Sequence, residues 1–155
     1  MTKAAARIPP GPLTQRALAL FVRSHVALYR VSGGRLFGTL GGAPLLLLTT
    51  TGRRSGKERT VPLIYVPGPD PILVASNGGA KRHPLWYLNA KANPAVDVQI
   101  GRDRFRALVE VVEGAEREAA WSRAVAIYPP YGSYQAGTNR ELPVVALRAA
   151  WRTGC

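Results

Sequence analysis

Three segments of the sequence carry residue types that can do chemistry, and the first is a basic stretch at residues 49–60, TTTGRRSGKERT. Gly52 and Gly56 allow a tight turn with exposed backbone amides, and Ser55 adds a hydroxyl donor. Four cations lie within seven positions, namely Arg53, Arg54, Lys57 and Arg59. Backbone amides and guanidinium groups are strong donors to a phosphate or a carboxylate. The segment therefore predicts an anion site, with a solvated basic hairpin as the alternative.

The second segment, residues 75–94, reads ASNGGAKRHPLWYLNAKANP. A predicted strand ends at Ser76 and leads into a glycine pair, whose backbone can approach a ligand closely. Trp86 and Tyr87 follow on a predicted short helix, where an aromatic ring can stack against a planar ligand. Packing of the two rings in the protein core is the alternative.

The third segment, residues 128–135, reads YPPYGSYQ and repeats tyrosine at every third position. In a turn of helix or a loop this spacing places Tyr128, Tyr131 and Tyr134 on one side. Stiff aromatic walls with hydroxyl tips suit a flat, electrophilic substrate. A tyrosine cluster that only closes one end of the fold is the alternative.

Other kinds of site find no support in the sequence. His25 and His83 lie far apart and lack metal-ligand spacing, and the one cysteine is Cys155, so no metal is expected. No carboxylate pair, nucleophile elbow, phosphate loop or G-x-G-x-x-G motif stands out. We therefore expect a cofactor to carry the chemistry, with the protein supplying orientation and electrostatics.

Composition predicts one folded domain with a strongly basic N-terminal part. The chain has 155 residues, of which 46% are apolar and 19% charged, and its net charge is +12. Residues 1–60 hold ten basic groups and one acidic group, which gives 10 − 1 = +9. A phosphate- or carboxylate-bearing cofactor, an anionic membrane or a nucleic acid fits this charge. No bilayer-spanning run or signal peptide is apparent, so a cytoplasmic location is expected.

The N-terminal part is expected to contain a loose basic arm, residues 1–12, and an amphipathic helix over about residues 13–31. Thr14 is the expected N-cap, and the glycine pair at residues 33–34 the expected end. Arg16, Arg23 and Arg30 recur every seven residues and so lie along one side of this helix. Docking of the helix on the domain is the first expectation, and a membrane-surface anchor is the second.

The remaining elements predict an α+β fold, mainly β, in a single domain over residues 13–155. Six strands are expected at residues 45–50, 60–66, 72–76, 96–100, 104–112 and 142–148, and two short helices at residues 84–92 and 113–127. Their meander order favours an antiparallel sheet that curls into a barrel.

Four pieces in this order, LLTTTGRRSGKERTVPL, VASNGGAKRHPLWYLNAKANP, VQI and IYPPYGSYQ, resemble the deazaflavin (coenzyme F-420)-dependent nitroreductase and quinone reductase family of actinobacteria. The resemblance spans about residues 13–148. It implies a split β-barrel related to FMN-binding proteins, often preceded by a membrane-associating helix. It also implies hydride transfer from a reduced deazaflavin, which carries a phosphate and a polyglutamate tail, to quinones, nitroaromatics or activated alkenes. The expected location is cytoplasmic, with peripheral contact at the inner face of the membrane.

The resemblance also implies a role for each matched residue. The basic turn is expected to bind the phosphate of the cofactor. The next strand and the second segment are expected to contact its ring, and the tyrosines to contact the substrate. Cofactor-binding residues are then Arg53, Arg54, Ser55, Arg59, Thr60, Val61, Pro62, Leu63, Ile64, Val74, Ala75, Ser76, Asn77, Leu85, Trp86, Tyr87, Leu88, Asn89 and Tyr131. Ser76, Tyr131 and Tyr134 are the catalytic candidates, and Tyr128, Tyr131 and Tyr134 are the substrate contacts.

The sequence departs from the family pattern at two of these positions. Asn77 stands where relatives often carry a cation, whose role Lys81 or Arg82 can take, and Arg54 stands where relatives often carry lysine. A protein that carries or sequesters the cofactor without turnover stays open as an alternative to the deazaflavin reductase, and so do two other kinds of barrel. One is a related barrel that binds FMN or another flavin. The other is a nucleic-acid-binding barrel, which is disfavoured because the aromatic residues are not interleaved with arginines, so no nucleic acid is expected.

Overall fold

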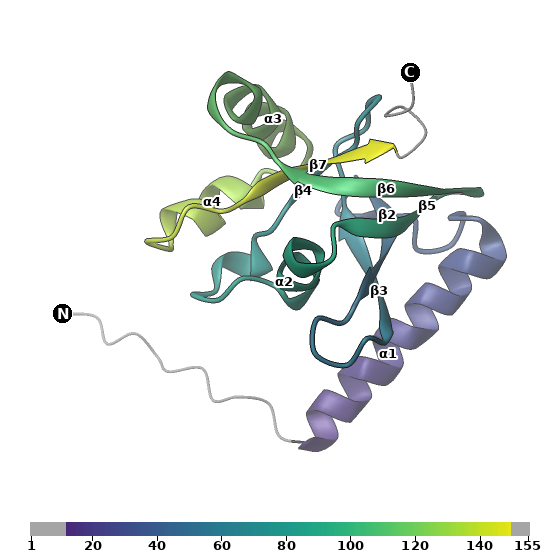
Figure 1. The fold of residues 1–155 in the computed structure, drawn as a ribbon. Coiled ribbons are helices and arrows are strands. Elements are labelled where there is room, and N and C mark those ends of the chain that lie inside the picture. Colours follow the sequence, from purple (N-terminus) through teal and green to yellow (C-terminus); the bar gives the residue numbers. More distant parts are fainter. Residues whose placement is uncertain (1–11, 150–155) are drawn as a thin grey trace.

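The computed structural model describes residues 12–149 (Figure 1). The basic arm predicted over residues 1–12 therefore lies outside the described residues, apart from Pro12, and so does Cys155. The elements, in chain order, are α1 (Pro12–Ser32), β1 (Thr39–Leu40), β2 (Ala43–Thr51), β3 (Glu58–Ile64), β4 (Ile72–Val74), the 3-10 turn η1 (Asn77–Gly79), α2 (Leu85–Ala92), β5 (Ala95–Ile100), β6 (Asp103–Val111), α3 (Gly114–Ile127), α4 (Pro130–Ala136) and β7 (Val144–Ala149). The predicted α+β class with a mainly antiparallel sheet is confirmed.

The seven strands form one sheet in the order β1-β2-β5-β6-β7-β4, and β3 pairs with β2 beside this path. Every ladder is antiparallel. The longest ladder joins β2 to β3, from Leu45 opposite Ile64 to Thr51 opposite Glu58. The basic turn, residues 52–57, connects β2 and β3 and therefore lies at the end of this hairpin.

The strand order corrects the simple meander expected from the sequence. The β2–β3 hairpin and the run β5–β6–β7 follow chain order, but β4 pairs with β7. After β3 the chain leaves the sheet through the proline-rich turn at residues 67–71, and one bridge joins Val66 to Ile72. Within residues 12–149 no ladder joins β3 to β4, so the barrel that we expected is not closed.

Both faces of the sheet are covered, which explains the uninterrupted apolar runs in β2 and β7. On one face, Leu46 and Leu48 pack with Trp86 of α2 and with strands β5 and β7. On the other face, Leu45 and Leu47 pack under α1, while the even-numbered residues of β4 and β7 pack under α3 and α4. Figure 1 shows α1 beside β3 and the pair α3 and α4 at the other end of the sheet, near β4 and β7.

Helix α1 matches the predicted helix but begins at Pro12, so Thr14 lies in its first turn and is not its N-cap. Val26 and Tyr29 fix its second half, because both are buried and the Tyr29 hydroxyl donates to the Leu45 carbonyl at 3.0 Å. That hydroxyl also accepts from the Gly101 amide at 2.9 Å. No helix within residues 12–149 combines the length and hydropathy needed to cross a bilayer.

Two other segments differ from the sequence-based expectation. The strand predicted over residues 72–76 stops at Val74, and Ser76 takes helical backbone angles as the cap of η1 (φ −77°, ψ −37°). The tyrosine segment forms helix α4, and the two-residue strand β1 was not predicted. The change at Ser76 turns its side chain out of the sheet and towards a cavity.

Candidate active site

Two adjoining cavities lie along β3 and α2, and Val61, Leu85 and Trp86 belong to both. The arginine cavity, about 850 Å³, lies under the basic turn. The tyrosine cavity, about 800 Å³, extends from the same wall to α4 and η1. One hydrophobic wall thus separates a cationic compartment from an aromatic one.

The basic turn is held by its own backbone and by α2. The Gly52 amide donates to the Lys57 carbonyl at 2.8 Å, and the Gly56 amide donates to the Gly52 carbonyl at 2.9 Å. A Cβ at Gly52 would lie 2.6 Å from the Ser55 hydroxyl oxygen and 3.2 Å from the Lys57 carbonyl oxygen, so a larger residue would have to displace the Ser55 side chain. These bonds use amides that the sequence suggested were open, and within residues 12–149 the Arg54 and Ser55 amides stay free of partners.

Asn89 of α2 ties the turn to the cavity floor. Its Oδ1 accepts from the Arg53 amide at 3.1 Å, and its Nδ2 donates to the Thr50 hydroxyl at 3.4 Å. Asn89 itself is buried. A single buried amide therefore fixes the turn above α2, which keeps the arginine cavity open.

The guanidinium groups of the turn have no carboxylate partners. Arg53, Arg54 and Arg59 line the arginine cavity and are exposed, and none of them forms an ion pair with any described residue. Thr60, the next residue on β3, is bonded to Thr49 at 2.7 Å and receives a hydrogen bond from Arg30 of α1 at 3.1 Å. The cavity thus offers positive charge that the protein does not neutralise.

The tyrosine cavity ends at an aromatic cluster, which consists of Tyr128 at the end of α3 and of Tyr131 and Tyr134 on α4. The ring of Tyr128 stands edge-on to Tyr131, with 5.0 Å between centroids, and its hydroxyl lies 3.4 Å from that of Tyr134. Tyr131 is only 6% exposed, and its hydroxyl makes no hydrogen bond within the described chain. Since no fully buried polar side-chain atom of the described residues lacks a partner, this hydroxyl must open onto the cavity.

The pKa values of two phenols of this cluster, Tyr131 and Tyr128, are raised. Burial raises the pKa of Tyr131 well above the ordinary value, and the neighbouring Tyr128 and Tyr134 add to the rise. The hydrogen bond with Tyr134 raises the pKa of Tyr128, and burial adds to it. At neutral pH, Tyr131 and Tyr128 are therefore O–H donors, which suits them to an oxygen that gains negative charge.

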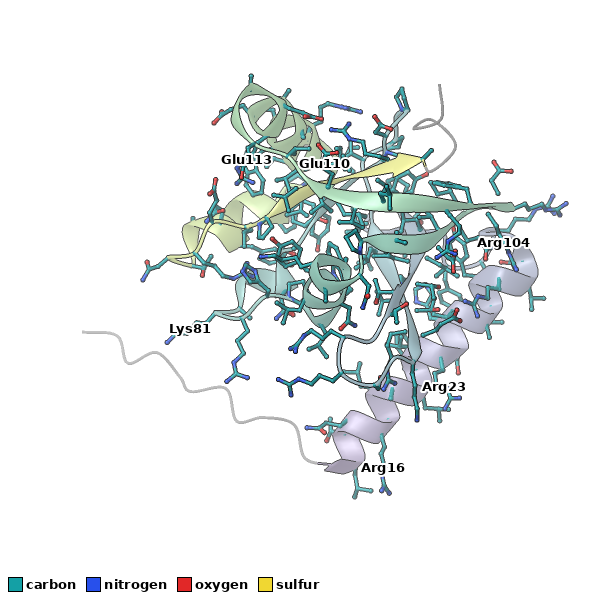
Figure 2. The ribbon with its side chains drawn as sticks, in the orientation of Figure 1. Arg16, Arg23, Lys81, Arg104, Glu110 and Glu113 are labelled. Atoms are coloured by element: carbon teal, nitrogen blue, oxygen red, sulfur yellow. The ribbon has the colours of Figure 1, made fainter. Side chains whose placement is uncertain are left out.

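Ser76 and Asn77 enter the tyrosine cavity from η1, opposite α4. The Ser76 hydroxyl makes no hydrogen bond to the described residues, whereas its carbonyl accepts from Arg140 at 2.7 Å. The Asn77 amide group donates to the Arg82 carbonyl at 3.0 Å. Arg82 lines this cavity, while Lys81 is exposed and points away from the body of the protein (Figure 2).

Most of the residues predicted for the cofactor meet at these two cavities. They are Arg53, Arg54, Ser55, Arg59, Thr60, Val61, Pro62, Leu63, Ile64, Val74, Ser76, Asn77, Leu85, Trp86, Asn89 and Tyr131. Ala75, Tyr87 and Leu88 line neither cavity. Tyr87 packs on His83, with 4.9 Å between ring centroids, and stands edge-on to Trp86, with 6.0 Å between centroids.

Helix α1 and Arg140 are the parts of the site that sequence reasoning missed. Gln15 and Ala19 line the arginine cavity, and Leu18 lines the tyrosine cavity. The helical periodicity predicted α1 but held no signal of what its first half would face. Arg140 acts through backbone carbonyls, which leave no trace in the sequence.

A third cavity, about 530 Å³, lies by the C-terminal part of α1. It touches β2 and β3, but none of the predicted site residues lines it. It mixes Arg30, Arg104 and Arg106 with Glu58 and Asp97, and Arg106 pairs with Asp97 at 3.3 Å. Its charges are largely balanced, unlike those of the arginine cavity. No cluster of potential metal ligands occurs within residues 12–149.

The antiparallel α+β fold places a cationic cavity, whose charge is not neutralised, beside an aromatic cavity. This arrangement suits an elongated ligand with an anionic arm and a flat head. The chain matches the family of F420H(2)-dependent quinone reductases over residues 21–149, and it belongs to that family. It is therefore an oxidoreductase, and its cofactor is reduced coenzyme F-420, as the sequence predicted.

Individual relatives agree with this assignment. A protein of Mycobacterium tuberculosis (strain H37Rv) named an F420H(2)-dependent quinone reductase is 38% identical over 133 residues, which cover 81% of this chain and 88% of that protein. A solved F420-H2 dependent reductase is 47% identical, covers 68% of this chain and 94% of its own, and has a TM-score of 0.64. A structure described as a domain-swapped dimer is 40% identical over 84% of this chain and 99% of its own, with a TM-score of 0.66.

Proposed function

We propose that the protein reduces a quinone with reduced coenzyme F-420 bound across the two cavities. The observation that carries this proposal is the shared wall of Val61, Leu85 and Trp86 between an arginine cavity and a tyrosine cavity. The anionic arm of the cofactor lies at the basic turn, and its flat ring lies along this wall. The acceptor lies in the tyrosine cavity. We also assign the bent, unclosed sheet to the split-barrel architecture.

The residues present fit such a cofactor. Arg53, Arg54 and Arg59 are exposed in the cavity without carboxylate partners, and the Arg54 and Ser55 amides are free within the described chain. These donors match phosphate and carboxylate oxygens, for which guanidinium forks are well suited. Val61 to Ile64 and Trp86 provide an apolar surface for a planar ring.

The bound deazaflavin supplies a hydride, and the quinone gains this hydride and a proton to become the hydroquinone. The protein's own part is to orient the acceptor and to donate hydrogen bonds to the oxygen on which negative charge develops. Tyr131 and Ser76 fit this role because their hydroxyls face the tyrosine cavity without partners among the described residues. Tyr134 or a water delivers the final proton in this scheme.

The same cavity supports a wider range of acceptors. Nitroaromatics and activated alkenes are flat and electrophilic like quinones, and their reduction also places negative charge on an oxygen. Tyr128, Tyr131 and Tyr134 provide rigid aromatic walls and hydroxyl donors, which suit any flat electrophilic acceptor. We therefore propose quinones as the main substrates and these two classes as further ones.

The outer side of α1 supports a peripheral contact with the inner face of the cell membrane. Its outward face presents Leu13, Leu20 and Phe21, of which Leu20 is 66% and Phe21 63% exposed. Arg16 and Arg23 lie along the same helix (Figure 2). An apolar stripe flanked by arginines is typical of helices that lie in the interface of an anionic membrane. Such a contact would bring the site near lipid-soluble quinones.

The related alternatives are less well supported. FMN also carries a phosphate and a flat ring, but the family match and the relatives name F420H(2). A nucleic-acid-binding role would need aromatic rings in an open basic groove. Trp86 and Tyr131 are instead largely buried beside a cavity.

A binding and turnover experiment tests the proposal. Purified protein is titrated with oxidised and reduced coenzyme F-420 and, separately, with FMN. The reduced cofactor is then oxidised anaerobically in the presence of quinones, enones or nitroaromatics. We expect saturable binding of coenzyme F-420, weak or no binding of FMN, and the fastest turnover with a quinone. Tight FMN binding with no turnover of reduced coenzyme F-420 would overturn the proposal.

A further inference from the structure

Arg140, in the loop between α4 and β7, makes an unusual set of hydrogen bonds. Its Nη2 donates to the Ser76 carbonyl at 2.7 Å, its Nε donates to the Ala80 carbonyl at 2.8 Å, and its Nη1 donates to the Ala75 carbonyl at 3.3 Å. Its Nη1 also lies 3.1 Å from Nδ1 of His83. One guanidinium group thus joins four residues of a single segment, residues 75–83, more than fifty positions away in the chain.

This segment is the wall of the tyrosine cavity opposite α4. It carries Ser76 and Asn77 into the cavity and includes the glycine pair at residues 78–79. The segment has little regular structure of its own, because η1 is one 3-10 turn and Gly78 has a positive φ of 62°. Its position therefore depends on contacts with other elements.

Arg140 is itself anchored to α4. Nε2 of Gln135 donates to the Arg140 carbonyl at 2.8 Å, and Oε1 of Gln135 accepts from the Leu142 amide at 2.9 Å. Gly79 also packs closely on α4, since a Cβ there would lie 3.0 Å from the Tyr134 carbonyl oxygen. The guanidinium group consequently links the tyrosine side of the cavity to the serine side.

We propose that Arg140 is a positioning residue, which sets the distance and orientation of Ser76 relative to Tyr131 and Tyr134. This inference rests on the proposed function for its catalytic consequence, but its structural part stands on the hydrogen bonds alone. No carboxylate pairs with Arg140 within residues 12–149, so its role is to hold backbone oxygens and not to form an ion pair.

Arginine is suited to this role in a way that lysine is not. A planar guanidinium group carries five N–H donors in fixed directions, whereas an ammonium group has three on a freely rotating end. Arg140 uses Nε, Nη1 and Nη2 towards different acceptors. A lysine at this position can reach one or two of these acceptors, so it should restore part of the effect.

The test compares Arg140→Ala, Arg140→Lys and the control Arg123→Ala. Arg123 also donates to a backbone carbonyl, that of Pro67 at 2.6 Å, but it fastens the proline-rich turn, which lines neither cavity. Amide hydrogen exchange is measured by mass spectrometry for peptides covering residues 75–83 and for peptides covering β5 and β6. Cofactor affinity, kcat and the KM for a quinone are measured on the same samples.

We expect Arg140→Ala to speed exchange in residues 75–83 about tenfold or more, with β5 and β6 unchanged. Its kcat should fall by about tenfold to a hundredfold while the affinity for coenzyme F-420, held mainly at the basic turn, changes little. Arg140→Lys should lie between this variant and the wild type, and Arg123→Ala should match the wild type.

Three outcomes would overturn the inference. Unchanged exchange in residues 75–83 would show that Arg140 does not hold the segment. Faster exchange spread evenly over β5 and β6 would show general destabilisation, and a normal kcat with a loosened segment would remove the catalytic part. If the wild type reduces no quinone, the proposed function fails, but the exchange measurement still decides whether Arg140 positions the segment.

Discussion

The basic turn and the tyrosine helix α4 stand at opposite ends of the candidate site and are built in contrasting ways. The turn is exposed, carries arginines without carboxylate partners, and is fixed by backbone hydrogen bonds and by Asn89. Helix α4 is packed against η1 and α3, and its Tyr131 is buried with a raised pKa. The basic turn therefore presents positive charge to solvent, whereas α4 presents buried aromatic rings and protonated hydroxyls.

In the proposed function, this contrast assigns cofactor binding to the basic turn and the chemical step to the tyrosines. Exposed arginines would attract a polyanion and add to its affinity, and they line the arginine cavity and not the tyrosine cavity. Buried phenols add little to long-range attraction and act on charge that develops next to them. Substitutions at the two ends should therefore change different measured quantities.

The largest effect is expected for the double variant Arg54→Ala/Arg59→Ala. Loss of two charge-assisted partners should weaken cofactor binding by about 2–5 kcal/mol, which is roughly thirtyfold or more in Kd. Turnover at saturating cofactor should change far less. Isothermal titration calorimetry with coenzyme F-420 measures the affinity.

The matched control is Arg35→Ala/Arg104→Ala, which removes the same charge from exposed positions that line neither the arginine nor the tyrosine cavity. Its affinity should stay close to that of the wild type. An equal loss in both double variants would mean that net charge alone attracts the cofactor and that the turn is not its site.

The next largest effect is expected for Tyr131→Phe. Removal of one hydroxyl donor to developing charge should lower kcat about tenfold to a hundredfold and leave cofactor affinity almost unchanged. Steady-state kinetics with a quinone, beside a binding titration, measures both. Tyr65→Phe is the control, because Tyr65 is half-buried and lines neither cavity of the site. An unaltered kcat in Tyr131→Phe would remove the role proposed for this hydroxyl.

The sequence predicted the two ends of the site better than the structure between them. Periodicity located α1, α2, α3 and the longer strands, and the basic turn and tyrosine repeat were visible as local patterns. The sequence left the tyrosine segment open between a turn of helix and a loop, because Gly132 disfavours a helix. The buried ring of Tyr131 stabilises α4 through tertiary packing. In this segment, tertiary packing outweighs the local conformational preference of the residues.

Long-range pairings were also beyond the sequence. Strand β4 pairs with β7, about seventy residues later, and the similar apolar runs of the other strands gave no reason to choose that partner. Arg140 binds carbonyl oxygens, which every residue possesses, so no side-chain complement marks its target. Trp86 lines both cavities whereas its neighbour Tyr87 lines neither, and only the placement of α2 decides this difference.

Arg148 contrasts with the arginines of the basic turn, because it has carboxylate partners and a structural role. It binds Glu116 of α3 at 2.6 Å, Asp70 at 3.0 Å and Glu110 of β6 at 3.4 Å. The hydrogen bond to Glu116 raises its pKa most, against the opposing effect of burial, and those to Asp70 and Glu110 add to the rise. Three acidic groups would be left without their common partner if it were removed.

Arg148→Met should therefore lower the free energy of unfolding by about 1–2 kcal/mol, since this is a network and not an isolated surface pair. Cofactor affinity should not change. Arg59→Met is the control at the basic turn and should show the reverse pattern, with normal stability and weaker binding. Urea unfolding followed by circular dichroism measures the stability. Normal stability in Arg148→Met would mean that water satisfies the three carboxylates equally well.

The smallest effect concerns His83, which lies at the tyrosine end. Burial lowers the pKa of His83 below its ordinary value of 6.5, and the positive charges of Arg140 and Lys91 lower it further. Its ring also packs on Tyr87, and it shares a small cavity with Glu113, Arg117 and Glu141. Neutral His83 can accept the hydrogen bond from Arg140, whereas the protonated ring would place an N–H against the guanidinium group.

The sign of the pH dependence follows from this lowered pKa. Between the folded pKa and 6.5 the unfolded chain binds more protons at His83 than the folded chain, so stability from this group is complete above pH 6.5 and is lost on acidification. The free energy of unfolding of the wild type should therefore fall more steeply below pH 6.5 than that of His83→Gln, and the two slopes should agree above it. Urea unfolding from pH 5 to 8 measures both slopes. Parallel curves throughout would show that His83 titrates alike in the folded and the unfolded state, and the tyrosine end would then lack this pH-sensitive contact.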